Sequence, residues 1–408
     1  MRKPGASRPL APAAQKEHIM ERYPLPYFRL LILGLLMLLA TAHLSPVFGQ
    51  AQFSISTYLM RDDNAFRSRN QTNDWISTLA GTGSYTWGGD NWALQSYYKG
   101  DYSQFAEYSE RANTAHRMGM GLSGLLGESV IGTMGVSWRG RYNTNDYSIY
   151  NTQEINFNSN LRWTVSETSI LTAGISMLRN NFTEFKEITN NEYLMSAAFQ
   201  HFFETRTSLK LTTSLGHKVY PNQTRINYLP NAYYQNRLPQ QFEETIEASQ
   251  LSMGVTVGQS LLPKTGLSLS AGTRQYLSDA IEQYVQDDYL FTENDLFDDP
   301  YASESNWLGA TLTHQFAIGF QMKLGTELQW KNYKGTPAFD EAGSLLPDVR
   351  DDLRKEYYFM ITKKFSTPWK LPSTIDVFTN VMLRDNASND KYYDYFDHIG
   401  LVGFTLGF

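Results

Sequence analysis

The sequence predicts an all-β fold, a transmembrane antiparallel up-and-down β-barrel of about 16 strands. Three observations carry this prediction. From Phe53 onward, segments of roughly ten to fourteen residues alternate apolar and polar side chains. The connections between these segments alternate between short and long. Finally, 14% of the residues are aromatic, and aromatic side chains favour both strands and membrane–water boundaries.

The alternation is regular in residues 154–163, 208–219 and 320–331. Successive side chains of a strand point to opposite faces. In the last of these segments, one face holds Phe320, Met322, Leu324, Leu328 and Trp330, and the other holds Gln321, Lys323, Glu327, Gln329 and Lys331. Strands of this length match the roughly 9–11 tilted residues that cross a bilayer. Full charges on the polar face favour a wet lumen.

The connections give the strand number. Short ones fall at residues 88–91, 127–128, 166–167, 204–206, 263–264, 319 and 368–372. Long ones fall near residues 62–74, 103–112, 143–152, 180–190, 221–245, 278–305, 334–354 and 385–394. Seven turns and eight long loops join 16 strands, and barrels of this class have short periplasmic turns and long external loops. Fourteen strands is the alternative, because segments 53–61 and 355–366 are less regular.

The N-terminal region, residues 1–51, predicts an extension and an export signal, and residues 52–408 form the predicted barrel. Leu30 to Ala42 read LLILGLLMLLATA, which is uncharged and of signal-peptide length, and Arg22 and Arg29 precede it. Small residues at 40–42 and 49–51 offer two cleavage contexts, of which the second is favoured. We expect translation to start at Met20, because residues 1–19 are unusual ahead of a signal peptide.

Composition excludes several classes of function. The net charge is -6 without a basic stretch, so no nucleic-acid partner is expected. The chain has no cysteine, which excludes disulfides, thiolate metal sites and a lipid anchor on cysteine. After position 50 no run of about 20 apolar residues forms a helical membrane span.

The chain ends HIGLVGFTLGF, with Val402, Phe404, Leu406 and the terminal Phe408 on one face of the last strand. This ending resembles the closing strand of Gram-negative, porin-like outer-membrane β-barrels. The resemblance implies export, cleavage of the signal, residence in the outer membrane among lipid and lipopolysaccharide, and recognition of the last strand by the barrel assembly machinery. Residues 384–408 also resemble the end of surface lipoprotein assembly modifier barrels, which carry periplasmic helical repeats. We expect no such domain here, because strand-like sequence begins almost directly after the predicted signal.

Charged side chains recur on the predicted lumen face, and basic ones outnumber acidic ones. The candidates are Lys99, Arg139, Arg141, Arg162, Lys210, Lys218, Arg274, Lys323, Glu327 and Arg384, with Asp101, Lys331 and Asp376 beside them. In an open pore they would focus a positive potential and favour anions. In a closed lumen they would pair with one another.

The longest loop, residues 278–305, is acidic and contains no Lys or Arg. Carboxylates bind Ca²⁺, a hard cation, and the candidate ligands are Asp287, Asp288, Glu293, Asp295, Asp298 and Asp299. The alternative is a solvated loop tied to lipopolysaccharide through divalent ions. We expect any constriction of the pore to come from the fifth to seventh loops, and no organic cofactor is expected.

Three functions are therefore compared. The favoured one is a passive, porin-like channel for small polar or anionic solutes, because a 16-stranded barrel leaves room for water. The second is a structural or assembly barrel that binds a partner protein through its loops or periplasmic rim; a homo-oligomer is also open. The third, an outer-membrane hydrolase, is disfavoured because the histidines match no nucleophile or metal motif. Tryptophans near strand ends indicate interface belts rather than a sugar-stacking path: Trp92, Trp138, Trp163, Trp307, Trp330 and Trp369.

Overall fold

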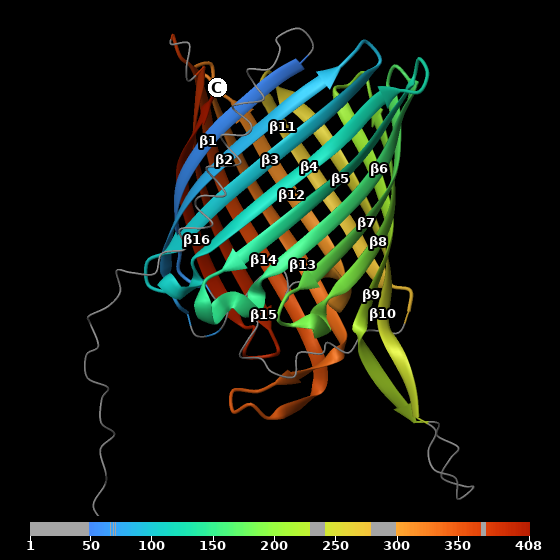
Figure 1. Ribbon diagram of the computed structural model, residues 1–408, viewed down its shortest axis with the longest axis vertical. Helices are drawn as coiled ribbons and strands as arrows, with labels where there is room; N and C mark the ends of the chain where they lie inside the picture. The colour runs from blue at the N-terminus through green and yellow to red at the C-terminus, as the bar shows by residue number, and fades with distance from the viewer. Residues whose placement is uncertain are drawn as a thin grey trace, which may run out of the picture.

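The computed structural model describes residues 49–408 except 66, 68, 70, 229–240, 279–298 and 369–372. Its sixteen strands form one closed sheet in which sequence neighbours pair antiparallel (Figure 1). The first eight are β1 (Gly49–Asp62), β2 (Asp74–Gly88), β3 (Trp92–Phe105), β4 (Asn113–Leu125), β5 (Val130–Asn143), β6 (Thr152–Ser166), β7 (Ser169–Phe182) and β8 (Asn190–Phe202). The others are β9 (Thr207–Tyr228), β10 (Gln241–Leu262), β11 (Thr265–Tyr276), β12 (Glu304–Gln315), β13 (Phe320–Phe339), β14 (Leu345–Ser366), β15 (Thr374–Ser388) and β16 (Tyr395–Gly407).

The predicted all-β barrel and its strand number are confirmed, and the fourteen-strand alternative is wrong. Segments 53–61 and 355–366, the irregular ones, lie within β1 and β14. Short 3₁₀ turns are η1 (Ser109–Arg111), η2 (Asn145–Tyr150), η3 (Lys186–Ile188) and η5 (Pro300–Ala302). No helix among the described residues is long and apolar enough to cross a membrane.

The first and last strands close the barrel. β1 pairs with β16 from Ser54↔Gly407 to Asp62↔Ile399. At one end of this seam, the Phe408 N–H donates to the Phe53 carbonyl at 2.8 Å, and the two rings lie 5.5 Å apart. The terminal Phe408 is therefore part of the closing contact.

The two ends of the barrel differ. Seven connections of two to seven residues lie at one end, and the eight other connections, of five to 27 residues, lie at the opposite end, which we call the long-loop end (Figure 1). The expected loop bounds are wrong at two places. Residues 221–245 were expected to be a loop, but β9 continues to Tyr228 and β10 begins at Gln241. Residues 334–354 were expected to be a loop, but β13 and β14 continue through them as a projecting hairpin, leaving only 340–344 as the turn. The polar residues on both faces there hid the alternation, because neither face of a projecting hairpin is apolar.

The two faces of the wall have opposite character. On β4, the large side chains of Met118, Met120 and Leu122 are exposed and lie outward, while Arg117, directly before Met118, points inward. Outward apolar residues recur on other strands; Trp87, Trp92 and Trp163 lie near strand ends, whereas Trp330 lies in the middle of β13. An apolar outer band with aromatic residues at its rims fits a lipid environment.

One tryptophan departs from the expected belt. Trp307 on β12 shares a cross-strand row with Gly272 on β11, and a Cβ at Gly272 would come within 2.1 Å of the indole ring. The ring therefore lies flat on the inner wall, where only glycine leaves room for it. Trp369 lies outside the described residues.

Candidate functional site: the lumen wall and its long-loop end

The cross-strand register fixes which charged residues share the lumen. Directly paired residues lie on the same face of a sheet, and one row runs Lys99↔Arg117↔Arg139↔Glu154 across β3 to β6. By the same argument the structure places these predicted residues on the inner face: Lys99, Arg139, Arg141, Arg162, Lys210, Lys218, Arg274, Lys323, Glu327 and Arg384. Whether any of them contacts a solute stays a prediction.

Four cations gather on the wall formed by β3, β4 and β5, which we call the basic wall: Lys99, Arg117, Arg139 and Arg141. Together with Asp101 they line a cavity of about 540 Å³, whose apolar part includes Ile76 and Phe105. Arg139 donates to Glu154 at 3.2 Å. No hydrogen bond or ion pair joins Lys99 or Arg117 to another described residue, although the Asp101 carboxylate lies close enough to Lys99 to attract it electrostatically.

The sequence-based list missed Arg117. Its strand reads NTAHRMGMGL, with an arginine among glycines and methionines. The period-two rule, applied from Met118, Met120 and Leu122, would have put residue 117 on the polar face and found it.

The opposite wall is mixed in charge rather than basic. Arg384 on β15 donates to Glu356 on β14 at 2.7 Å, and Arg354 lies 3.4 Å from the same carboxylate. Glu327 faces Glu356 directly across β13 and β14. Basic and acidic groups therefore pair on this wall; whether the lumen is open or closed stays a prediction.

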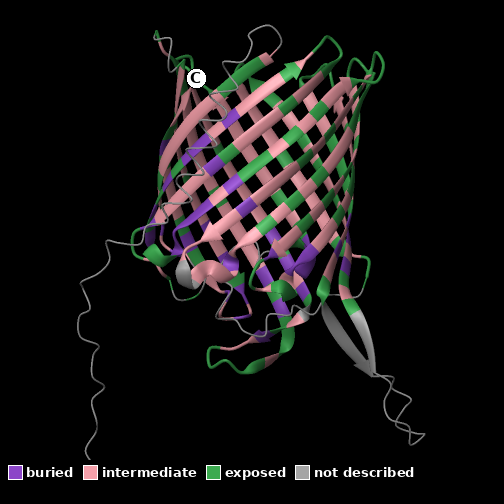
Figure 2. Ribbon diagram, viewed as in Figure 1, coloured by how far each residue is buried: buried purple, intermediate pink, exposed green. Residues whose placement is uncertain are grey.

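Buried residues gather toward the long-loop end (Figure 2). Part of the long connection between β11 and β12 enters the barrel there. Tyr301 is buried over Gly216 and its hydroxyl donates to Glu192 at 3.1 Å. Asp299 accepts from Lys218 and, at 2.8 Å, from the Tyr220 hydroxyl. Residues 299–303 thus narrow this end, and they belong to the sixth loop.

The Asp299–Lys218 pair gives a stability prediction. Replacing Asp299 by Ala leaves the buried Lys218 ammonium without its carboxylate, so we expect the free energy of unfolding to fall by about 3–5 kcal/mol. Denaturant titration of the detergent-refolded barrel measures this change. The matched control is Asp385→Ala, which removes the acid of the half-exposed outward pair Lys355–Asp385 and is expected to change stability little. Equal losses of unfolding free energy in the two variants would contradict a special contribution of the buried Asp299–Lys218 pair.

The remaining calcium candidates are not brought together by the described structure. Asp287, Asp288, Glu293, Asp295 and Asp298 lie outside the described residues. Asp299 is engaged by Lys218, Tyr220 and the backbone N–H of Tyr301. Calcium binding by this loop stays a prediction.

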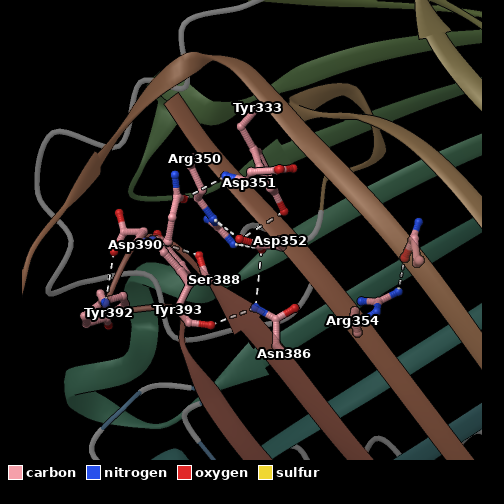
Figure 3. Close-up of polar contacts among 12 residues, drawn as sticks. Tyr333, Arg350, Asp351, Asp352, Arg354, Asn386, Ser388, Asp390, Tyr392 and Tyr393 are labelled. Carbon is pink, nitrogen blue, oxygen red and sulfur yellow. Dashed lines mark hydrogen bonds and ion pairs between the residues drawn. The ribbon is translucent and has the colours of Figure 1, made fainter. Parts of the chain in front are cut away.

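A second buried network holds the β13–β14 hairpin to the turn at residues 389–394 (Figure 3). The Arg350 guanidinium lies 4.1 Å from the centre of the Tyr333 ring and 3.4 Å from that of Tyr393, and it donates two hydrogen bonds to Asp352, of 3.0 and 2.6 Å. Asn386 donates to the Tyr393 carbonyl at 2.7 Å. Arg350 thus stacks on two tyrosine rings and pairs with Asp352 through two hydrogen bonds, and together these contacts fix the hairpin against the turn.

The turn at 389–394 predicts a pH dependence. Burial raises the pKa of the Asp390 carboxyl, against the hydrogen bond that it accepts from the Tyr392 N–H. A raised folded-state pKa favours the protonated acid, so its contribution to stability is present below about pH 4 and is lost as pH rises through the folded pKa. Asp390→Asn, neutral at every pH, is expected to unfold at a higher temperature than wild type at pH 7 and at a similar temperature near pH 4. Heat-shifted gel mobility at both pH values measures the unfolding temperatures. If the variant gains no stability over wild type at pH 7, the prediction is contradicted.

The five histidines of the described residues face outward on five strands. His217 lies 2.9 Å from Ser249 Oγ and 3.7 Å from Glu247. The same hydroxyl contact recurs at Ser169–His201 and Thr265–His314, each at 2.8 Å. A contact repeated at separate heights of the wall is a cross-strand pair, and it does not single out a nucleophile.

Comparison with solved structures agrees with this architecture. The chain matches Acinetobacter baumannii OccAB1 with a TM-score of 0.51 at 9% identity, covering 88% of this chain and 96% of that one. The chain has the fold of a porin-like outer-membrane barrel. Pseudomonas aeruginosa OccD3 (OpdP) matches with a TM-score of 0.48 at 11% identity, covering 88% and 91%, and P. aeruginosa OprD with 0.48 at 10%, covering 88% and 95%. No family model and no curated protein matches this porin-like barrel.

Proposed function

We propose that this porin-like barrel is a passive outer-membrane channel for small polar solutes and that it prefers anions. The single observation that carries the proposal is the basic wall. Lys99 and Arg117 line two cavities of about 540 and 690 Å³ and make no ion pair with a described residue. Four cations share this wall with one carboxylate, Asp101. A cation that no hydrogen-bonded acid neutralises attracts mobile anions, and a low-dielectric surround strengthens that attraction.

The location follows from the same fold. Bacterial outer-membrane barrels have an apolar outer band, short turns at one end and long loops at the other. We infer that the chain is exported with cleavage of its signal peptide, and that the long-loop end faces the cell exterior, next to lipopolysaccharide.

The alternative functions have less support. A barrel that acts by binding a partner protein would rest on the projecting β13–β14 hairpin, but nothing in the structure identifies the partner. Hydrolysis would need a nucleophile with an adjacent base and an oxyanion site, whereas the outward Ser/Thr–His contacts recur as cross-strand pairs at separate places on the wall.

Planar-bilayer recording of the refolded chain, residues 52–408, tests the channel. We expect stable conductance steps and a reversal potential in a KCl gradient that shows chloride to be more permeant than potassium. A folded barrel without conductance would overturn the proposal, and co-purification of a stoichiometric partner from native membranes would then favour the partner-binding function. A cation-selective channel would overturn only the anion preference.

A further inference from the structure

Three carboxylates meet where the first and last strands close the barrel at the long-loop end. Asp62 ends β1, Asp63 follows it, and Asp397 lies on β16. One oxygen from each lies within 4.8 Å of the others. Residues more than 330 positions apart in the sequence thus present three acids to one point.

Asp397 is the observation that points to a ligand. Its side chain is 0% exposed, and apart from the Asp62 carboxyl, which can share a proton with it, no hydrogen-bond donor reaches either carboxylate oxygen. The nearest cation is Arg384, whose Nη1 lies 3.6 Å from Oδ2 while its Nε donates to Glu356 at 2.7 Å. A buried carboxylate that accepts no hydrogen bond is costly, so this one requires a proton or a further cation.

The other two acids accept hydrogen bonds but keep further lone pairs on their carboxylate oxygens. Asp62 uses Oδ1 to accept the Asn64 N–H at 2.9 Å. Asp63 accepts from the backbone N–H and the ring of His398 and remains partly exposed, which gives an ion a path from solvent. Ca²⁺ takes oxygen ligands in irregular geometry and accepts waters and carbonyls beside them, whereas Mg²⁺ demands a near-ideal octahedron.

The geometry points to a divalent-cation site, preferring Ca²⁺, formed by Asp62, Asp63 and Asp397 across the β1–β16 seam. The ion joins the end of the first strand to the last strand and so holds the barrel closed at the long-loop end. Arg384 and Arg67 lie close enough to oppose the ion electrostatically, which weakens its binding. This site does not depend on the barrel being a channel.

Terbium luminescence tests the site in the refolded full barrel, stripped with EDTA and kept free of lipopolysaccharide. We expect a saturable Tb³⁺ signal that Ca²⁺ displaces, and a loss of affinity of at least about ten-fold in Asp397→Asn. The temperature at which heat unfolds the wild-type barrel should rise with Ca²⁺, and this rise should be absent in the variant. The matched control is Asp376→Asn, an inner-face acid at the short-turn end of β15, which should keep both responses.

Two further variants separate the alternatives. If Asp397→Asn does not fold, Asp63→Asn at the partly exposed position provides the same two measurements. A variant in which the acids of residues 287–298 are neutralised should still show the rise in unfolding temperature that Ca²⁺ causes in wild type. The proposal is overturned if Ca²⁺ stabilises wild type and Asp397→Asn equally, if the loop variant alone abolishes the response, or if wild type binds no Tb³⁺ saturably. The last result would mean that Asp62 and Asp397 share a proton instead.

Discussion

Replacing Lys99 and Arg117 together by Glu is expected to convert an anion-preferring channel into a cation-preferring one. The two residues are direct cross-strand partners in the basic wall, and both line the same two cavities. The exchange puts two negative charges where two positive ones lay and leaves the strand pairing unchanged. A change of 1–2 kcal/mol in the relative energies of the two ions alters their permeability ratio by a factor of roughly 5–30. The reversal potential in a KCl gradient should therefore change sign.

The control for this experiment is Arg61→Glu. Arg61 lies on β1 with the guanidinium over the outward Trp75 ring, so the same reversal of charge occurs outside the lumen. We expect its selectivity to equal that of wild type. Equal shifts in both variants would show that surface charge, rather than the basic wall, sets the selectivity.

Deletion of Phe408 is expected to abolish most assembly of the barrel in cells while sparing refolding in detergent. The residue closes the seam with Phe53 through its backbone and ring, but it is one contact among many along β16. The resemblance of the last strand to those read by the assembly machinery implies a larger loss in the cell than packing alone explains. The measurement is the heat-shifted fraction in outer membranes compared with the fraction refolded from urea.

The matched control is Phe365→Ala, which removes an exposed aromatic ring from β14 near the same end of the barrel. This variant should assemble nearly as well as wild type. If deletion of Phe408 reduces refolding in detergent as much as assembly in cells, the terminal residue acts through packing and not through recognition.

The strands could be predicted because their signal is local. Lys323 and Glu327 occupy odd-numbered positions of one strand, and Leu324 and Leu328 occupy even-numbered ones. Because side chains alternate between the two faces of a strand, this difference alone places the two pairs on opposite faces. The register then follows from pairing with sequence neighbours. The same rule applied to residues 113–125 would have found Arg117.

The long-loop end could not be predicted in the same way. Tyr301 enters the barrel because Gly216 leaves space and Glu192 accepts its hydroxyl, and those partners lie about a hundred residues earlier in the chain. Arg350 is held between Tyr333 and Tyr393, and Asp397 meets Asp62 only after the barrel has closed. Each contact joins positions whose sequence surroundings carry no sign of the other.

The gathering of buried charge at one end has an electrical consequence. Buried charged residues and the folded-in residues 299–303 lie at the long-loop end, whereas the opposite end carries only short turns. A conduit that is narrow and charged at one end passes unequal currents at equal and opposite voltages, because ions accumulate in front of the narrow end in one direction and are depleted there in the other. Current through a single inserted barrel should therefore rectify, and the sign of the rectification would report in which direction each molecule entered the bilayer.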